Sequence, residues 1–215
     1  MARRVSRSLE PMSKVDTAWL RMESPTNLMM ITGIMVLDDR LDLARLRKVM
    51  AQRFLAYRRF RQKAVETAGG AHWETDPDFD LDWHVCSADL PGKGGKDALQ
   101  RYVSRLASTP LDPSRPRWQF HVIERYGKGS ALVTRMHHCY ADGIALVQVL
   151  LSLTDAKVSK QQTRDLAYGI AAHANVGFDV SLAEVERWKT TDFAEGYDVL
   201  IYNICMADNQ DAALI

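Results

Sequence analysis

The stretch from Trp118 to Gly143, WQFHVIERYGKGSALVTRMHHCYADG, decides the fold and carries the main chemical signal of this sequence. Residues 118–125 and 130–136 are rich in β-branched and aromatic side chains, and a Gly-Lys-Gly turn separates them. Two such runs joined by a short glycine-containing turn favour an antiparallel β-hairpin. We therefore predict two paired strands that lead directly into a histidine-containing loop.

The segments on either side of this hairpin predict further strands and helices. Residues 144–153 are almost wholly apolar but too few to cross a bilayer, so they predict a buried helix. Residues 29–37 predict a strand, and Asp42 is a candidate N-cap for a helix whose apolar positions recur at spacings of three and four up to Tyr57. Residues 98–107 predict another helix. The expected fold class is α/β (α+β), a mixed sheet flanked by helices.

The loop after the second strand has the pattern HHxxxDG, formed by His137, His138, Asp142 and Gly143. An imidazole titrates close to neutral pH, so it can accept a proton from a hydroxyl group without prior activation. A loop residue that rigid elements hold in place is a common site of catalysis. Gly143 permits a turn that other residues tolerate poorly, and Asp142 can brace the loop. The pattern makes the histidines candidates for general-base catalysis.

The same residues allow plainer interpretations. A pair of histidines is often only a partly buried polar patch. Adjacent side chains on an extended segment point to opposite sides, so the two imidazoles do not readily share a metal ion, and we predict no metal site. Nothing near Cys139 favours a thiolate, so we expect it to pack in the interior.

Composition excludes several classes of protein. The 215 residues include 28 basic and 27 acidic side chains, and this balance argues against nucleic acid as a partner. Residues 1–63 nevertheless carry a net charge of +8, which suits a solvated helix face, an anionic ligand or an anionic membrane surface. Three scattered cysteines and the lack of a signal-peptide pattern indicate a reducing, cytoplasmic location.

Two further segments resemble ligand-binding loops only superficially. Alternating aspartates in residues 76–82 lack the glycine and the terminal glutamate of a calcium loop. Residues 91–95 are rich in glycine but lack the Lys-Ser/Thr ending of a phosphate loop, so we expect a flexible connection.

The composition changes near Thr154, and we predict a domain of residues 1–155 followed by a short α/β tail of residues 156–215. Residues 177–180 and 197–202 have strand character in that tail. These two segments weakly resemble part of a trehalose-utilisation-type α/β domain. The tail shows no catalytic pattern, and we assign it no chemistry.

Four ordered motifs within residues 9–155 together resemble a known family. HHxxxDG is the signature of acyltransferases of the chloramphenicol acetyltransferase-like superfamily. Three further segments are similar to segments of bacterial wax ester synthase/diacylglycerol acyltransferases: residues 11–19, 24–30 and 111–118. The last stretch departs from that family's Pro-Leu-Trp motif, because Arg117 stands in place of the leucine between Pro116 and Trp118.

The resemblance implies a fold, a reaction and residue roles. The fold would be the first half of a chloramphenicol acetyltransferase-like protein. His138 would be the general base that deprotonates a diacylglycerol or a long-chain alcohol, whose oxygen then attacks the thioester of an acyl-coenzyme A co-substrate without any cofactor. His137 would support the loop geometry at the catalytic site. The remaining motif residues would be structural: Asp142, Gly143, Pro116 and Trp118.

Proteins of that family are about twice as long and place their substrate tunnel between two similar halves. Half a tunnel would expose apolar surface, which implies association as a homodimer, with a membrane surface or with lipid droplets. It would also exclude water poorly, so a truncated or chimeric, non-catalytic lipid- or partner-binding half-domain is the alternative function. A binding module dominated by the tail is a third interpretation.

Overall fold

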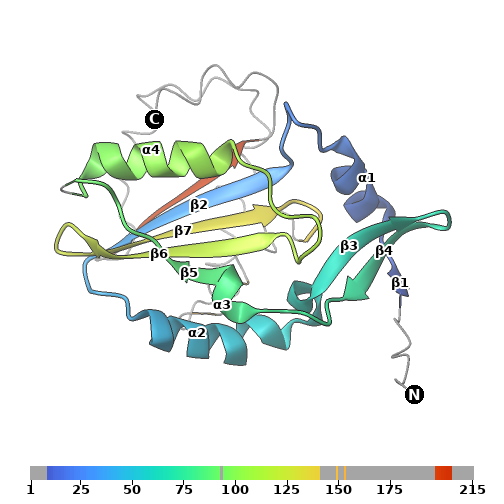
Figure 1. The fold of residues 1–215 in the computed structure, drawn as a ribbon, viewed down its shortest axis with the longest axis horizontal. Helices are drawn as coiled ribbons and strands as arrows, with labels where there is room; N and C mark the ends of the chain where they lie inside the picture. The colour runs from blue at the N-terminus through green and yellow to red at the C-terminus, as the bar shows by residue number, and fades with distance from the viewer. Residues whose placement is uncertain (1–8, 93, 141–148, 150–152, 154–196, 205–215) are drawn as a thin grey trace, which may run out of the picture.

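The structure, a computed structural model, describes residues 9–92, 94–140, 149 and 153, together with the backbone of residues 197–204. Most of the predicted helix at 144–153 and the tail segment at 177–180 lie outside these residues. Within the part that is described, helices pack on a five-stranded sheet, and a smaller three-stranded sheet lies at its side (Figure 1).

The larger sheet has the strand order β5-β6-β7-β2-β8. Its strands are β2 (Met30–Leu37), β5 (Val85–Ser87), β6 (Trp118–Tyr126), β7 (Gly129–His137) and β8 (Tyr197–Ile204). The strands β6 and β7 form the predicted antiparallel hairpin, β2 runs antiparallel to β7, and β5 runs parallel to β6. The expectation of a mixed sheet is therefore confirmed.

The strand β8, which comes from the predicted tail, pairs antiparallel with β2 along all eight residues. The backbone of this segment thus extends the same sheet that carries the histidine loop. The domain boundary at residue 155 stays a prediction, because the sheet pairing concerns residues 197–204 alone.

Helices cover both faces of this sheet (Figure 1). α4 (Lys96–Ala107) confirms the helix predicted at 98–107, and its buried Leu99 and Leu106 pack against Ala131 and Val133 of β7. On the other face, α2 (Leu43–Gln52) packs against the alternate β7 side chains. Side chains alternate across a strand, and the two faces of β7 therefore face two separate apolar clusters.

The helix that begins after Asp42 is shorter than its apolar pattern predicted. Asp42 is the N-cap, and its Oδ1 accepts a hydrogen bond of 2.6 Å from the N–H of Arg45. The α-helix ends at Gln52 instead of continuing to Tyr57, and two 3₁₀ helices follow, η1 (Phe54–Ala56) and η2 (Arg58–Arg61). These tight turns bring Phe54 into contact with Phe60 in the core, with ring centroids 3.9 Å apart. Burial of this aromatic pair outweighs the helical periodicity.

The smaller sheet has the order β1-β4-β3 and joins β1 (Leu9–Pro11), β3 (Gln62–Thr67) and β4 (Gly70–Thr75). From the sequence we did not predict β3, because its sequence QKAVET is mostly polar and lacks a hydrophobic signal. Its inward residue Ala64 lies opposite Trp73, which is completely buried.

Two of the four aspartates in residues 76–82 accept hydrogen bonds from nearby backbone N–H groups. Asp76 Oδ1 accepts a hydrogen bond from the N–H of Asp78, and Asp80 caps the short helix α3 (Leu81–His84). Among the residues that the structure describes, no group of three or more acidic, histidine or cysteine side chains is placed to hold a metal ion. In that same part of the chain, no helix is both long enough and apolar enough to span a membrane.

Candidate active site

The two histidines lie where β7 ends, and backbone hydrogen bonds hold them from both neighbouring strands. His137 donates its N–H to the carbonyl of Arg117, at 3.0 Å, just before β6. His138 donates its N–H to the carbonyl of Met29, at 2.8 Å, just before β2. The carbonyl of His137 accepts the N–H of Tyr140, which closes a tight turn. The sheet therefore fixes the backbone on which both imidazoles stand.

The side chain of His138 is almost fully buried, with 4 % of its surface exposed. The indole of Trp19, from α1 (Lys14–Met22), stacks on its imidazole with ring centroids 4.6 Å apart and planes inclined by 20°. The predicted base therefore does not face open solvent. Aromatic stacking on Trp19 favours this inclination of the imidazole plane.

The imidazole of His137 is completely buried and lies between a backbone amide and a carboxylate. Its Nδ1 accepts a hydrogen bond of 3.1 Å from the N–H of Cys139. Its Nε2 lies 3.6 Å from Oε2 of Glu23, the residue that ends α1. Glu23 Oε2 also accepts a hydrogen bond of 2.6 Å from Nη1 of Arg117.

The pKa of Glu23 reflects this environment. Partial burial by itself raises the pKa of the carboxyl group, but the contact with His137 and the charge and hydrogen bond of Arg117 outweigh it and hold the pKa below its usual range. The carboxylate is thus ionised at neutral pH.

Sequence reasoning missed Trp19, Glu23 and the pairing role of Arg117. The available signal was the four-residue spacing of Trp19 and Glu23, which places them on one helix face.

Trp118 lies in the core beneath the site. Its side chain is completely buried, and its Nε1 donates a hydrogen bond of 2.8 Å to the carbonyl of Phe60. Pro116 precedes it in the turn that leads into β6, where the carbonyl of Pro116 accepts the N–H of Trp118. The roles predicted for these two residues stay predictions, and Asp142 and Gly143 lie outside the described residues.

Cys139 is nearly fully buried in the core cluster, which agrees with a packing role. Burial raises the pKa of its thiol far above the ordinary value. A neutral thiol is a poor nucleophile, and this environment gives no support to thiolate chemistry at Cys139.

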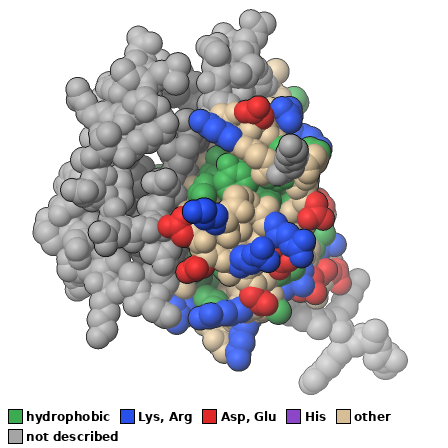
Figure 2. All heavy atoms as spheres, turned by 90° about the vertical axis from the view of Figure 1, so that its left-hand side faces the viewer, with side chains coloured by type: hydrophobic (Ala, Val, Ile, Leu, Met, Phe, Trp, Pro, Cys, Tyr) green, Lys and Arg blue, Asp and Glu red, His purple; other side chains and the backbone are tan. Residues whose placement is uncertain are grey.

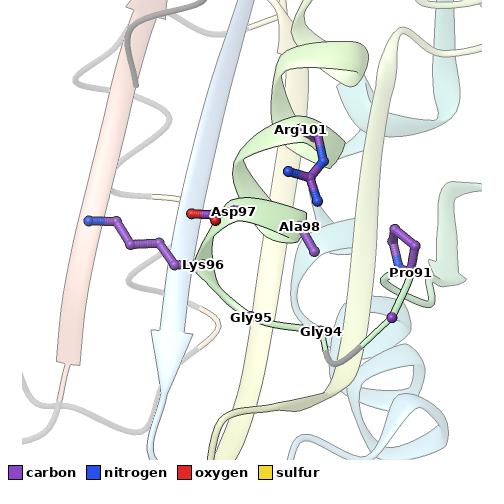
Figure 3. Close-up of a pocket in the computed structure, with 8 residues that line it drawn as sticks. Pro91, Gly94, Gly95, Lys96, Asp97, Ala98 and Arg101 are labelled. Carbon is purple, nitrogen blue, oxygen red and sulfur yellow. The ribbon is translucent and has the colours of Figure 1, made fainter.

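A surface hollow of about 320 Å³ lies at the N-terminus of α4 (Figure 3). Its lining includes Gly94, Gly95, Asp97 and Arg101, while the side chain of Lys96 points away from it. Gly94 lies close to the β6–β7 turn, at the opposite end of β7 from the histidines. Nine strand residues span roughly 30 Å, so this hollow is remote from the imidazoles.

On the face that Figure 2 shows, Lys and Arg side chains are interspersed with Asp and Glu side chains. On α2, Arg47 is engaged within the protein: its Nε lies 3.1 Å from Oδ1 of Asp82 and 2.9 Å from the carbonyl of Val85. A solvated helix face with structural ion pairs explains this part of the charge asymmetry.

Comparison with known proteins places these observations in a family. Residues 12–187 match the wax ester synthase/diacylglycerol acyltransferase catalytic domain. The chain is 39 % identical over 114 residues to a probable diacylglycerol O-acyltransferase of Mycobacterium tuberculosis, a match that covers 51 % of this chain and 25 % of that protein. The chain thus spans about a quarter of the length of this curated relative.

Solved structures show the same relationship. The wax ester synthase/diacylglycerol acyltransferase from Marinobacter aquaeolei superimposes with a TM-score of 0.56 and 26 % identity, covering 65 % of this chain and 35 % of the other. A starter condensation domain of rhizomide synthetase, solved with C8-CoA, gives a TM-score of 0.57 at 15 % identity, covering 77 % and 42 %. This second likeness shows that the fold is shared with a condensation domain. The chain belongs to the wax ester synthase/diacylglycerol acyltransferase family.

Proposed function

We propose that this chain carries the proton-accepting half of an acyl-coenzyme A-dependent O-acyltransferase, with His138 as the general base. The observation that carries the proposal is the placement of His138: a nearly buried imidazole at the end of β7, stacked on Trp19, in a chain of this family. A base shielded from bulk water can act on a hydroxyl group without competition from hydrolysis.

The proposed reaction needs no covalent intermediate. His138 takes the proton of the acceptor hydroxyl while its oxygen attacks the thioester carbonyl of the acyl-coenzyme A. The carbon–sulfur bond breaks, the coenzyme A thiolate leaves, and the proton on His138 passes to that sulfur. General-base assistance of this kind contributes a rate factor of roughly 10² to 10⁴.

The proposed acceptors are diacylglycerol, which yields triacylglycerol, and a long-chain alcohol, which yields a wax ester. Acyl-coenzyme A is the proposed co-substrate, and the mechanism calls for no cofactor. The names of the relatives support both acceptors, and a structural neighbour was solved with an acyl-CoA.

The proposed location is the cytoplasm, at a membrane surface or on lipid droplets, and association of two copies is part of the proposal. Val15 and Met22 support this, because both are apolar and more than half exposed on α1, the helix whose Trp19 contacts His138. Flotation with phospholipid vesicles and light scattering test the two forms of association separately.

The test is acyl transfer by the purified chain. Long-chain acyl-coenzyme A is supplied with diacylglycerol or hexadecanol, and both released thiol and lipid product are measured. We expect His138→Ala to lower the rate by about a hundredfold or more. The matched control is His72→Ala, because His72 lies in β4 and its imidazole Nδ1 is within hydrogen-bond distance of the Thr67 hydroxyl and the Gly70 carbonyl.

Equal rates for the unaltered chain and His138→Ala would refute catalysis by this imidazole. Lipid binding without transfer by the unaltered chain would instead support the second candidate, a non-catalytic lipid-binding half-domain. The match covers 25 % of the length of the curated relative, so lipid binding without acyl transfer should be measured directly.

A further inference from the structure

We propose that Glu23 and Arg117 are positioning residues. The Glu23 carboxylate, held by Arg117, selects the tautomer of His137 that is protonated at Nε2. This tautomer maintains the turn that presents His138. The tautomer and its effect on the turn follow from contacts within the chain. Only the consequence for acyl transfer rests on the proposed function.

The hydrogen bond from Cys139 determines where the proton on His137 lies. A backbone N–H can only donate, so Nδ1 of His137 must accept and must be unprotonated. In a neutral imidazole the proton is then on Nε2. Because the His137 side chain is completely buried, bulk water does not meet this N–H.

Glu23 is the group that faces that proton. Its Oε2 lies 3.6 Å from Nε2 of His137, which is longer than an ordinary hydrogen bond but close enough for a strong charge–dipole attraction. The opposite tautomer would turn a nitrogen lone pair toward the carboxylate and an N–H toward the N–H of Cys139. Both contacts would be repulsive, so the site favours protonation at Nε2.

Arg117 fixes the same oxygen atom. Its Nη1 donates a 2.6 Å hydrogen bond to Glu23 Oε2, and the Arg117 side chain is 11 % exposed. A charge-assisted hydrogen bond of this length holds the carboxylate in one position. Arg117 stands where the family's Pro-Leu-Trp motif has leucine. The hydrogen bond from Arg117 to Glu23 therefore depends on a residue in which this chain departs from that motif.

The turn transmits the choice of tautomer to His138. The N–H of His137 bonds to the carbonyl of Arg117, and the N–H of Cys139 bonds back to the His137 ring. His138 lies between these two anchors, and its ring must meet Trp19. If the His137 ring loses its Cys139 bond, the backbone that follows His138 loses one of its anchors, while the bond from the His138 N–H to Met29 remains.

The direct test is the ¹⁵N chemical shifts of both imidazole nitrogens of His137 and His138 in the labelled full chain. We expect an unprotonated Nδ1 and a protonated Nε2 for His137. Glu23→Gln retains a carbonyl oxygen and should keep this tautomer. Glu23→Ala should give a mixture of tautomers, and Arg117→Leu should do so to a smaller extent. Shifts of the His138 ring should change with those of His137.

Two control variants remove comparable charges elsewhere. Glu66→Ala breaks the exposed ion pair to Arg21 of α1, and Arg115→Leu changes an arginine two residues from Arg117. Neither should alter the His137 shifts. If Glu23→Ala unfolds the chain because Arg117 is left buried without its partner, the neutral double variant Glu23→Gln/Arg117→Leu removes that charge. It should fold and keep the protonated Nε2.

Activity provides the second measurement. We expect Glu23→Ala to lower kcat for acyl transfer by about a hundredfold with little change in KM, since small displacements of catalytic groups have effects of that size. Glu23→Gln should recover most of the loss. A chain without transfer activity would refute the proposed function, while the imidazole shifts would still decide this inference. A protonated Nδ1 in the unaltered chain, or His137 shifts that Glu23→Ala leaves unchanged, would overturn it.

Discussion

Trp19 and His138 stack face to face, with ring centroids 4.6 Å apart, although 118 positions separate them in sequence. Trp19 and Glu23 are four residues apart, so the same side of α1 reaches both histidines: Trp19 contacts His138, and Glu23 faces His137. Ser13 caps this helix by accepting the N–H of Asp16. The position of α1 therefore controls the orientation of both imidazoles.

Replacing Trp19 should impair catalysis more than folding. A stacked aromatic pair contributes about 0.5–1.5 kcal/mol beyond its buried area. We expect Trp19→Ala to lower kcat about tenfold, which corresponds to the upper end of that range, and Trp19→Phe to retain most activity. Steady-state acyl transfer measures both. Lys14→Ala, at an exposed position of the same helix, is the control, and an equal loss there would contradict the role of the stack.

Two buried histidines should make stability dependent on pH. Burial lowers the pKa of His84 and of His121 to about 4. Between pH 6.5 and 4 the unfolded chain binds protons that the folded chain does not, so the free energy of unfolding should fall as the pH falls. The full effect is on the order of 3 kcal/mol per histidine.

The variant His84→Phe isolates one of these contributions. The His84 ring stacks on Trp118, with centroids 4.1 Å apart, and phenylalanine preserves that contact. We expect the loss of stability between pH 6.5 and 4 to shrink by about half, because His121 still contributes. Urea unfolding at several pH values measures it, with pH 8 as the reference. An unchanged slope would show that His84 is protonated in the folded protein.

Trp118 should be a principal determinant of stability. It is completely buried and packs against Phe54 and His84. We expect Trp118→Ala to lower the free energy of unfolding by about 3–5 kcal/mol. Trp118→Phe keeps most of the packing but leaves the carbonyl of Phe60 without its donor, at a cost of about 1–3 kcal/mol. Urea denaturation measures both, and similar losses for the two variants would assign the effect to the hydrogen bond alone.

Gly129 should tolerate no side chain. A Cβ atom at this position would overlap the carbonyl oxygen of Leu37, where β7 begins beside the end of β2. Gly129→Ala should cost about 3 kcal/mol through this overlap. Gly127, in the same turn, has a φ of +58° but open space around it, so Gly127→Ala should cost only about 1 kcal/mol. Thermal unfolding compares the two variants. A larger loss of stability for Gly127→Ala than for Gly129→Ala would show that β2 moves away at no cost.

The sequence by itself determined the elements with strong local signals. The β6–β7 hairpin, β2, α4 and the Asp42 cap were predictable, because alternation, helical spacing and turn residues act over a few neighbouring positions. The histidine loop was predictable from its pattern. The strand β3 was not, since QKAVET has almost no apolar signal, and neither was the end of α2, because burial of Phe54 against Phe60 depends on distant residues.

Only the tertiary structure decided which side chains surround the histidines. Trp19, Glu23 and Arg117 come from two segments that the sheet brings to the end of β7, and no local pattern encodes such a meeting. The backbone pairing of β8 with β2 is likewise a contact between positions at least 160 residues apart. Local propensity specifies which elements form, whereas burial and the pairing of polar groups across the fold specify which residues meet.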